Sequence, residues 1–214
     1  MDIADIDFEA LKDRGLYIAT PMYGGQCFSG YAFALAKLSE LCGAGGIKLH
    51  IDFPYNSSLI PLARNLLANR FLETDCEHLL FWDADVEIAP ANIFKLMAHQ
   101  ADNPAYDIIG AAYPVKRIRW DVVEKAVHAG FKGPELQDYA AGFPVLPIAN
   151  ATYDDGLNLN APMEVESITT GMMMIRRSVL ERFANEYPDL RYWDTGMSSN
   201  IQVSFFDCGV DAES

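Results

Sequence analysis

The chain has 214 residues, of which 50% are hydrophobic, 21% are charged and 12% are aromatic. This composition fits one ordinary globular domain or two very small ones, and it excludes collagen, coiled coils and intrinsically disordered chains. Sixteen basic residues against thirty acidic ones give a formal net charge of −14. Because the basic residues do not cluster strongly, neither nucleic acid nor an anionic lipid surface is an expected partner.

Signals for export and for membrane insertion are missing from the sequence. The first ten residues are acidic, which is the opposite of a signal peptide start. No apolar run reaches the ~18 to 20 residues that span a bilayer, so we expect no transmembrane segment. The four cysteines, at positions 27, 42, 76 and 208, form no C-x-x-C pair. We therefore expect free thiols in a cytoplasmic setting, bacterial or, for a viral protein, that of the host.

The first half of the sequence predicts alternating strands and helices. Expected strands cover 16–20, 47–53, 79–82 and 108–113, and expected helices cover 29–42, a stretch after Ser57 or Ser58, and 90–99. Gly43 occupies a position typical of a helix C-terminal cap, and Ser57 or Ser58 can cap the second helix. This order predicts an α/β fold with a largely parallel sheet and right-handed crossovers.

The second half is less regular. Residues 133–162 contain many Gly, Pro and Asn residues and show no clear period, which is typical of a functional or disordered loop. Beyond them, 164–168, 171–175 and 202–206 read as strands and 178–186 as a helix.

Asp83 and Asp85 follow an apolar run that is typical of a strand buried on both faces. Ligands of open α/β sheets collect at the carboxyl ends of strands, where two carboxylates can jointly hold Mg²⁺ or Mn²⁺. The spacing alone is weak, because Asp5 and Asp7 share it in a segment without expected chemistry. The position after two β-α units favours a cation site over a solvated acidic turn.

Two further motifs lie in the same half of the sequence. Arg64 and Asn65 lie on the second helix, where the arginine fork suits a phosphate, although an exposed helix arginine is an equal alternative. The loop Thr20-Pro21-Met22-Tyr23 offers a hydroxyl and an aromatic ring to a nucleoside base, and an ordinary turn explains it nearly as well.

Two more motifs lie further along the chain. Residues 113–120 gather three basic residues, including Lys116, beside two aromatic ones, which suits a pyrophosphate or sugar contact or, alternatively, a solvated turn. Thr170 and Gly171 precede three methionines; the glycine allows close approach of a sugar ring, and the methionines are expected in the core. The histidines are scattered and expected to be structural, and serine-hydrolase, dinucleotide and P-loop motifs are missing.

In their order along the chain, these motifs resemble those of GT-A glycosyltransferases, in particular the viral and bacterial group that includes the small chlorella-virus capsid glycosyltransferase domain. The resemblance covers residues 15–207. It implies one GT-A domain over 1–214, with a mixed, mostly parallel central sheet flanked by helices. Residues 1–120 would form the donor-binding half and residues 121–214 the acceptor-side half, truncated at its C-terminus if the natural chain extends further.

The resemblance also implies a reaction and roles for residues. The protein would transfer a hexose or deoxyhexose from a UDP- or GDP-linked donor to a hydroxyl of a glycan or protein-linked glycan, with Mn²⁺ or Mg²⁺ held by Asp83 and Asp85. Inversion is the expected outcome, although the residues leave the stereochemistry open. The implied donor-binding residues are Thr20, Pro21, Met22, Tyr23, Arg64, Asn65, Trp82, Asp83, Ala84, Lys116, Thr170 and Gly171.

The sequence departs from this family at its end. Related sequences continue past a segment like 205–208 into an acidic pair that is expected to supply the general base, whereas this chain stops at Ser214. Either Asp207 or Asp211 serves as the base, or the chain binds the donor and transfers poorly.

Two alternatives stay open. A haloacid-dehalogenase-like phosphatase would use Asp83 as nucleophile and Asp85 as acid with Mg²⁺, although Glu87, the late position of the motif and the order of Thr169-Thr170 oppose it. The second alternative is a domain that binds a nucleotide sugar but does not transfer the sugar.

Overall fold

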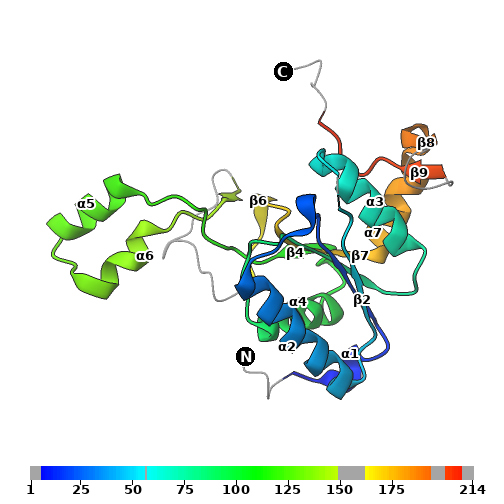
Figure 1. Ribbon diagram of the computed structural model, residues 1–214, viewed down its shortest axis with the longest axis horizontal. Helices are drawn as coiled ribbons and strands as arrows, with labels where there is room; N and C mark the ends of the chain where they lie inside the picture. Colours follow the sequence, from blue (N-terminus) through cyan, green and yellow to red (C-terminus); the bar gives the residue numbers. More distant parts are fainter. Residues whose placement is uncertain (1–5, 56, 149–161, 194–200, 209–214) are drawn as a thin grey trace. The chain divides into compact units, whose positions relative to one another are not determined.

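The computed structural model describes residues 6–55, 57–148, 162–193 and 201–208. They form a mixed α/β protein in which helices flank a central, mostly parallel sheet (Figure 1). By internal contacts the chain divides into two compact units, residues 1–110 with 170–214 and residues 111–169. The expected functional division at residue 120 stays a prediction.

The central sheet belongs to the larger unit and has the strand order β2-β1-β3-β7-β4. β1 pairs in parallel with β2 and β3, whereas β7 runs antiparallel between β3 and β4. Consequently the carboxyl ends of four strands and the start of β7 share one edge, the carboxyl edge; the opposite edge is the amino edge. The strands are β1 (Leu16–Ala19), β2 (Leu49–Asp52), β3 (His78–Trp82), β4 (Ile108–Gly110) and β7 (Met172–Arg176).

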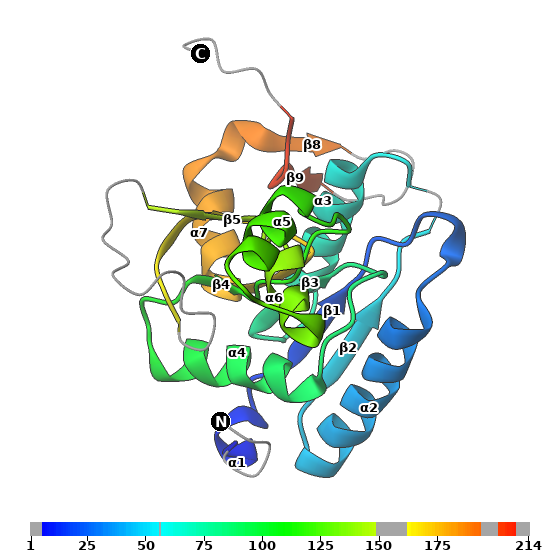
Figure 2. The same cartoon turned by 90° about the vertical axis from the view of Figure 1, so that its left-hand side faces the viewer.

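Helices cover both faces of this sheet. Figures 1 and 2 show α2 and α4 on one face and α3 and α7 on the other. Residues 16–19 of β1, 78–82 of β3 and 172–175 of β7 are all buried, which confirms the expected core placement of the methionines. The helices are α1 (Phe8–Leu11), α2 (Ser29–Gly45), α3 (Ile60–Leu72), α4 (Pro90–Asp102) and α7 (Arg177–Glu186).

Two expected helix caps are wrong. Gly43 lies inside α2, and the residue that ends the helix in the left-handed conformation is Gly46, at φ 68°. The helix continues past Gly43 because only a later glycine takes the positive φ that a C-terminal cap requires. At the start of α3 neither serine is the cap residue, which is Leu59, and the Ser57 hydroxyl donates instead to the Leu59 carbonyl.

The smaller unit contains more regular structure than the sequence predicted. Part of the supposedly irregular stretch 133–162 is helical, as η3 (Gly133–Glu135) and α6 (Leu136–Ala140), and residues 149–161 lie outside the described part. These short helices follow α5 (Trp120–His128), which the sequence analysis did not predict, and a strand pair, β5 (Val145–Pro147) with β6 (Val165–Ile168).

The larger unit has a few further elements. The expected strand 108–113 ends at Gly110, and the expected strand 202–206 is β9 (Ile201–Val203). β9 pairs antiparallel with β8 (Arg191–Trp193), and two short 3-10 turns, η2 (Tyr23–Gly25) and η4 (Pro188–Leu190), complete the unit. Among the described residues, no helix combines the length and apolar character that crossing a bilayer requires.

Candidate functional site

The acidic turn, residues 83–87, leaves β3 at the carboxyl edge. The Asp83 N–H donates to the Gly171 carbonyl at 2.9 Å, and the Val86 N–H donates to the Asp83 carbonyl at 3.0 Å. The first of these bonds ties the turn to the residue that precedes β7. The structure therefore brings Thr170 and Gly171, both predicted from the sequence, to the edge that carries Asp83 and Asp85.

The start of α2 clamps the turn from another side. The Phe28 N–H donates to the Ala84 carbonyl at 2.9 Å. The Glu87 carboxylate lies against the first turn of α2, where a Cβ atom added to Gly30 would come within 2.2 Å of its Oε2. A larger residue at position 30 would therefore turn the exposed Glu87 carboxylate aside, whereas the Phe28 hydrogen bond holds the backbone of the turn itself.

Trp82 and Thr20 support this edge from the interior. Trp82 is fully buried; its indole N–H donates to the Val86 carbonyl at 2.8 Å, and its ring packs on Tyr31 with centroids 4.5 Å apart. The Tyr31 hydroxyl forms a 2.7 Å hydrogen bond with Thr20 Oγ1, and burial raises the pKa of Tyr31 to about 12. The structure thus places both side chains below the surface, and donor contact by either stays a prediction.

Arg64 reaches the acidic turn from α3. Its Nη2 lies 3.1 Å from Asp83 Oδ1, and its guanidinium carbon lies 5.8 Å from the centre of the Phe81 ring. The side chain of Arg64 is 12% exposed and that of Asp83 is 35% exposed, whereas Asp85 is an exposed residue. The arrangement places a largely buried cation beside one of two accessible carboxylates.

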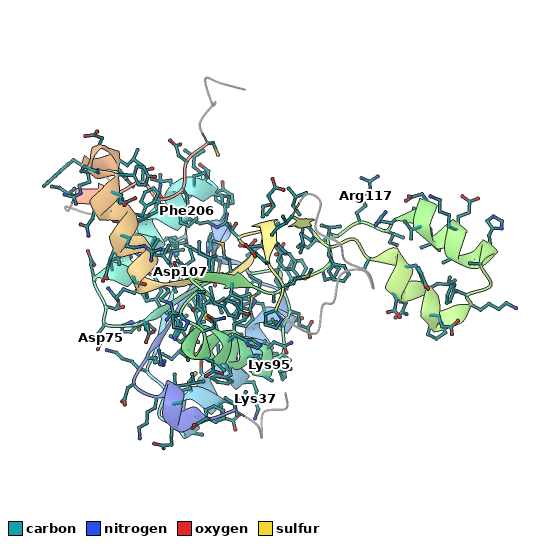
Figure 3. All side chains as sticks on the ribbon, turned by 180° about the vertical axis from the view of Figure 1, so that it is seen from behind. Lys37, Asp75, Lys95, Asp107, Arg117 and Phe206 are labelled. Atoms are coloured by element: carbon teal, nitrogen blue, oxygen red, sulfur yellow. The ribbon has the colours of Figure 1, made fainter. Side chains whose placement is uncertain are left out.

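Asn65, the neighbour of Arg64, is buried and binds a distant part of the chain. Its Oδ1 accepts the N–H groups of Phe205 and Phe206, both at 2.8 Å, and its Nδ2 donates to the Phe206 carbonyl at 2.9 Å. The Phe206 ring packs edge-on against Phe81 at 5.2 Å, and Figure 3 shows it beside α3. These contacts hold the segment just before Asp207 near the carboxyl edge.

Asp207 itself is exposed, and its Oδ1 accepts the Cys208 N–H. Asp211, the other candidate base, lies outside the described residues. A signal for the anchoring role of Asn65 was present in the sequence: Asn69 follows one helical turn later, and its amide also binds the distant segment at Val203.

Exposed aromatic rings surround the end of β1. Tyr23 and Tyr55 are both exposed, and Met22 joins Tyr55 through an isolated parallel bridge. Of the other predicted loop residues, Pro21 is half-buried and Met22 is buried. Phe28, next to the acidic turn, is also exposed. Of these three rings only Tyr23 was predicted from the sequence, because Tyr55 and Phe28 become neighbours of the edge only through the fold.

Lys116 belongs to the smaller unit, where it is exposed. In the same unit, Thr169 Oγ1 donates to the Tyr113 hydroxyl at 2.9 Å. The expected contact of Lys116 with a diphosphate stays a prediction.

The carboxylates of Asp83 and Asp85 suit a cation that protein and ligand share. Throughout the described ranges, no group of three or more His, Cys, Asp and Glu side chains could hold a metal ion by itself. Mg²⁺ in particular is commonly held by one or two carboxylates together with phosphate oxygens of the ligand. The buried His78 plays a structural part instead, since its Nδ1 bonds to Gln100 Oε1 at 2.8 Å.

The four cysteines are free, as the sequence predicted. Cys27 and Cys208 are exposed, whereas Cys42 and Cys76 are buried. Burial raises the pKa of the Cys42 thiol to about 11, so it is protonated at neutral pH.

Comparison with solved structures gives several distant likenesses, of which two follow below. No protein-family model matches the chain, and no curated protein matches it. The chain is similar to the crystal structure of A197 from STIV, with a TM-score of 0.48 and 18% identity, over 79% of this chain and 68% of that one. It is also similar to the crystal structure of 4-diphosphocytidyl-2C-methyl-D-erythritol synthase from Anaerococcus prevotii, with a TM-score of 0.39 and 10% identity, over 88% of this chain and 81% of that one. At these scores neither likeness identifies a function.

Proposed function

We propose that this protein is a metal-dependent glycosyltransferase of GT-A type, which moves a sugar from a nucleoside-diphosphate donor to an acceptor hydroxyl. The observation that carries the proposal is the acidic turn at the carboxyl edge, with Arg64 paired to Asp83. Open α/β sheets bind their ligands at this edge. The family resemblance of the sequence motifs adds to this support.

Each side chain at the edge has a role that its chemistry permits. Asp83 and Asp85 hold Mn²⁺ or Mg²⁺, which when bound neutralises charge on the leaving nucleoside diphosphate. The Arg64 guanidinium is placed to pass from Asp83 to a phosphate oxygen, since both are anionic acceptors of its hydrogen bonds. Tyr23 and Tyr55 offer exposed rings on which a nucleobase can stack.

Asp207 is our choice for the general base. An inverting transfer needs a group that takes the proton of the acceptor hydroxyl. Asp207 is exposed, and Asn65 anchors the residue before it, which fixes its backbone near the edge.

A phosphatase of the haloacid-dehalogenase type is the second candidate, and it needs the first aspartate of the motif as attacking nucleophile. The ion pair of Arg64 with Asp83 does not distinguish the two enzymes, because a phosphate ligand would draw the guanidinium away in either. Glu87, where such phosphatases usually carry a small hydroxylated or apolar residue, opposes this candidate.

Calorimetric titration with UDP, GDP and dTDP, with and without Mn²⁺, tests the proposal. Saturable binding of one nucleotide only in the presence of metal is the expected result. The nucleotide that binds also identifies the nucleobase of the donor. Absence of nucleotide binding together with Mg²⁺-dependent hydrolysis of a phosphate ester would contradict it in favour of the phosphatase. Donor binding without release of the nucleoside diphosphate in the presence of glycan acceptors would identify a binding domain.

A further inference from the structure

Residues 113–132 of the smaller unit, the basic segment, differ in charge from the rest of the chain. They include five basic and two acidic residues, whereas the rest of the sequence holds eleven basic and twenty-eight acidic ones. The basic residues are Lys116, Arg117, Arg119, Lys125 and Lys132. A positive segment within an acidic protein favours contact with an anionic partner.

The same segment exposes apolar side chains. Trp120 is 69% exposed, Val127 51%, Ile118 49% and Val115 40%. Trp120 and Val127 are seven residues apart in α5 and therefore share one helix face, while Ala126, on another face, is buried. The packing of the smaller unit thus leaves this apolar face of α5 to solvent.

We propose that the basic segment docks this protein on an anionic lipid bilayer surface. Trp120 and Ile118 enter the headgroup region, where indole rings and aliphatic side chains are both favourable. Arg117 and Arg119 bind the lipid phosphates, since a guanidinium pairs well with a phosphate group. Figure 3 shows the Arg117 side chain projecting from the ribbon of the stretch that leads into α5.

Local charge decides this contact more than net charge. The net charge of −14 disfavoured an anionic surface at the level of the whole sequence. Charges farther away than about 8 Å are largely screened at physiological salt, so the carboxylates that oppose the contact are Asp121 and Glu124 in the segment and Glu135 and Asp138 just after it, which the five basic residues outnumber. Of the two acidic residues within it, Glu124 lies 4.0 Å from His128 on the same helix.

A bilayer fits the segment better than nucleic acid does. Both present phosphates, but a nucleic-acid backbone offers no apolar layer to Trp120, Ile118 and Val127, whereas the lipid interface does. Since α5 has nine residues, the expected attachment is peripheral and reversible.

Co-sedimentation of the full chain with vesicles tests the proposal. We expect at least tenfold more protein on vesicles of phosphatidylserine and phosphatidylcholine than on phosphatidylcholine alone, and a loss of binding near 1 M salt, where the Debye length is about 3 Å. The double variant Arg117→Gln and Arg119→Gln should lose at least tenfold in binding. The matched double variant Lys37→Gln and Arg191→Gln, which removes the same charge from exposed positions of the larger unit, should retain it.

Tryptophan fluorescence locates the contact. Trp82 is fully buried, whereas Trp120 and Trp193 are both exposed, so a blue shift on anionic vesicles reports one of the latter two. The shift should disappear in Trp120→Phe and persist in Trp193→Phe.

Several results would overturn the proposal. Equal binding to both vesicle types, no binding to either, or a blue shift that persists in Trp120→Phe would each exclude this docking surface. The arginine double variant could instead abolish tight binding of a DNA or RNA oligonucleotide, or self-association, and leave vesicle binding unchanged. That result would assign the segment to that partner. None of these measurements requires nucleotide or metal, so they stand apart from the proposed transferase activity.

Discussion

The two edges of the central sheet both carry charge, and they arrange it differently. At the amino edge, Glu77 lies between two arginines, 2.8 Å from Arg14 and 3.5 Å from Arg176. At the carboxyl edge, three acidic residues fall within the five positions of the acidic turn, and Arg64 pairs with Asp83. Ion pairs occur at both edges, since Asp52 at the end of β2 pairs with Arg70, but at the carboxyl edge three acidic residues also gather in one turn.

At the amino edge, charged side chains bind backbone carbonyls and one another at the ends of the helices and strands. Arg177 donates to the carbonyls of Cys76 at 2.8 Å and Phe71 at 3.0 Å, and its guanidinium lies over the Phe71 ring at 4.7 Å. Asp107, which precedes β4, lies 2.7 Å from Arg182 Nη2. The partners of these groups are supplied by the fold itself.

At the carboxyl edge, backbone contacts hold the acidic turn. Gly171 and Phe28 hold the acidic turn through main-chain hydrogen bonds, which leave the carboxylate of the exposed Asp85 at the surface. Accumulated charge of one sign costs stability unless a counter-ion is supplied. Under the proposed function the amino edge is a structural network and the carboxyl edge is the ligand site, and variants at each edge test this difference.

Asp85→Asn should give the largest effect. Loss of one cation-binding carboxylate is expected to weaken metal-dependent nucleotide binding at least a hundredfold, which is about 2.7 kcal/mol. Calorimetry of the variant with Mn²⁺ measures this. Asp75→Asn at the amino edge, where the exposed carboxylate pairs with Lys48, is the matched control and should bind normally. Equal losses in both variants would show a general charge effect.

Arg177→Met should destabilise the fold without altering nucleotide affinity. Its side chain is largely buried and bonds to several backbone carbonyls, so we expect a loss of about 3 kcal/mol in the free energy of unfolding. Urea unfolding measures it. Arg182→Met, at an exposed ion pair of the same edge, should leave the free energy of unfolding almost unchanged. If Arg177→Met changed the Kd for the nucleotide, the amino edge would have a part in ligand binding as well, which contradicts the difference between the edges.

Gly30→Ala should turn the Glu87 carboxylate aside and leave the acidic turn in place, because Glu87 is exposed and the new Cβ meets only the end of its side chain. We expect metal-dependent nucleotide binding within about twofold of the wild type. The free energy of unfolding should rise by up to about 1 kcal/mol, because alanine favours a helix over glycine. Calorimetry and urea unfolding measure the two, and a tenfold loss of binding would show that the Glu87 side chain holds the turn.

Arg64→Gln should change two affinities in opposite directions. Mn²⁺ alone should bind a fewfold more tightly, because Asp83 loses a competing cation. Binding of the nucleoside diphosphate with Mn²⁺ should weaken severalfold, because a phosphate partner is lost. Separate calorimetric titrations measure both, and parallel changes would argue against exchange of the guanidinium between Asp83 and the ligand.

The smallest expected effect is the pH dependence of stability that arises from His78. Burial lowers the pKa of this imidazole below its ordinary value of 6.5, so the unfolded chain binds its proton more readily than the folded chain. Stability is therefore full above about pH 7 and falls as the pH drops below 6.5, by at most about 1.4 kcal/mol per pH unit. Denaturant unfolding from pH 7.5 to 5 checks this, and His78→Gln should flatten the slope.

The sequence predicted those parts of the fold that depend on local pattern. The buried runs at 16–19 and 78–82 and the helices after them follow from apolar content and helix signals, and the acidic turn follows from its place after β3. The antiparallel insertion of β7 between β3 and β4 did not follow, because a continuous apolar strand carries no sign of its direction.

The site was predictable only in part, for a related reason. A polar helix residue such as Asn65 can face a ligand or a distant backbone, and its partners lie about 140 positions away in the sequence. The contact between Glu87 and Gly30 likewise joins residues from separate elements. Long-range contacts of this kind decide which of several plausible polar residues lie at a surface.

Paramagnetic broadening of amide NMR signals by Mn²⁺, in the presence of the nucleotide that binds, tests the central claim most directly. The account predicts that broadening is strongest for the amides of Asp83, Ala84 and Asp85, and that it extends to Tyr23 and Gly171 at the same edge. The amides of Glu77 and Asp107 at the amino edge should keep their linewidths. Broadening at the amino edge, or the same broadening in Asp85→Asn, would contradict the assignment of the carboxyl edge as the ligand site.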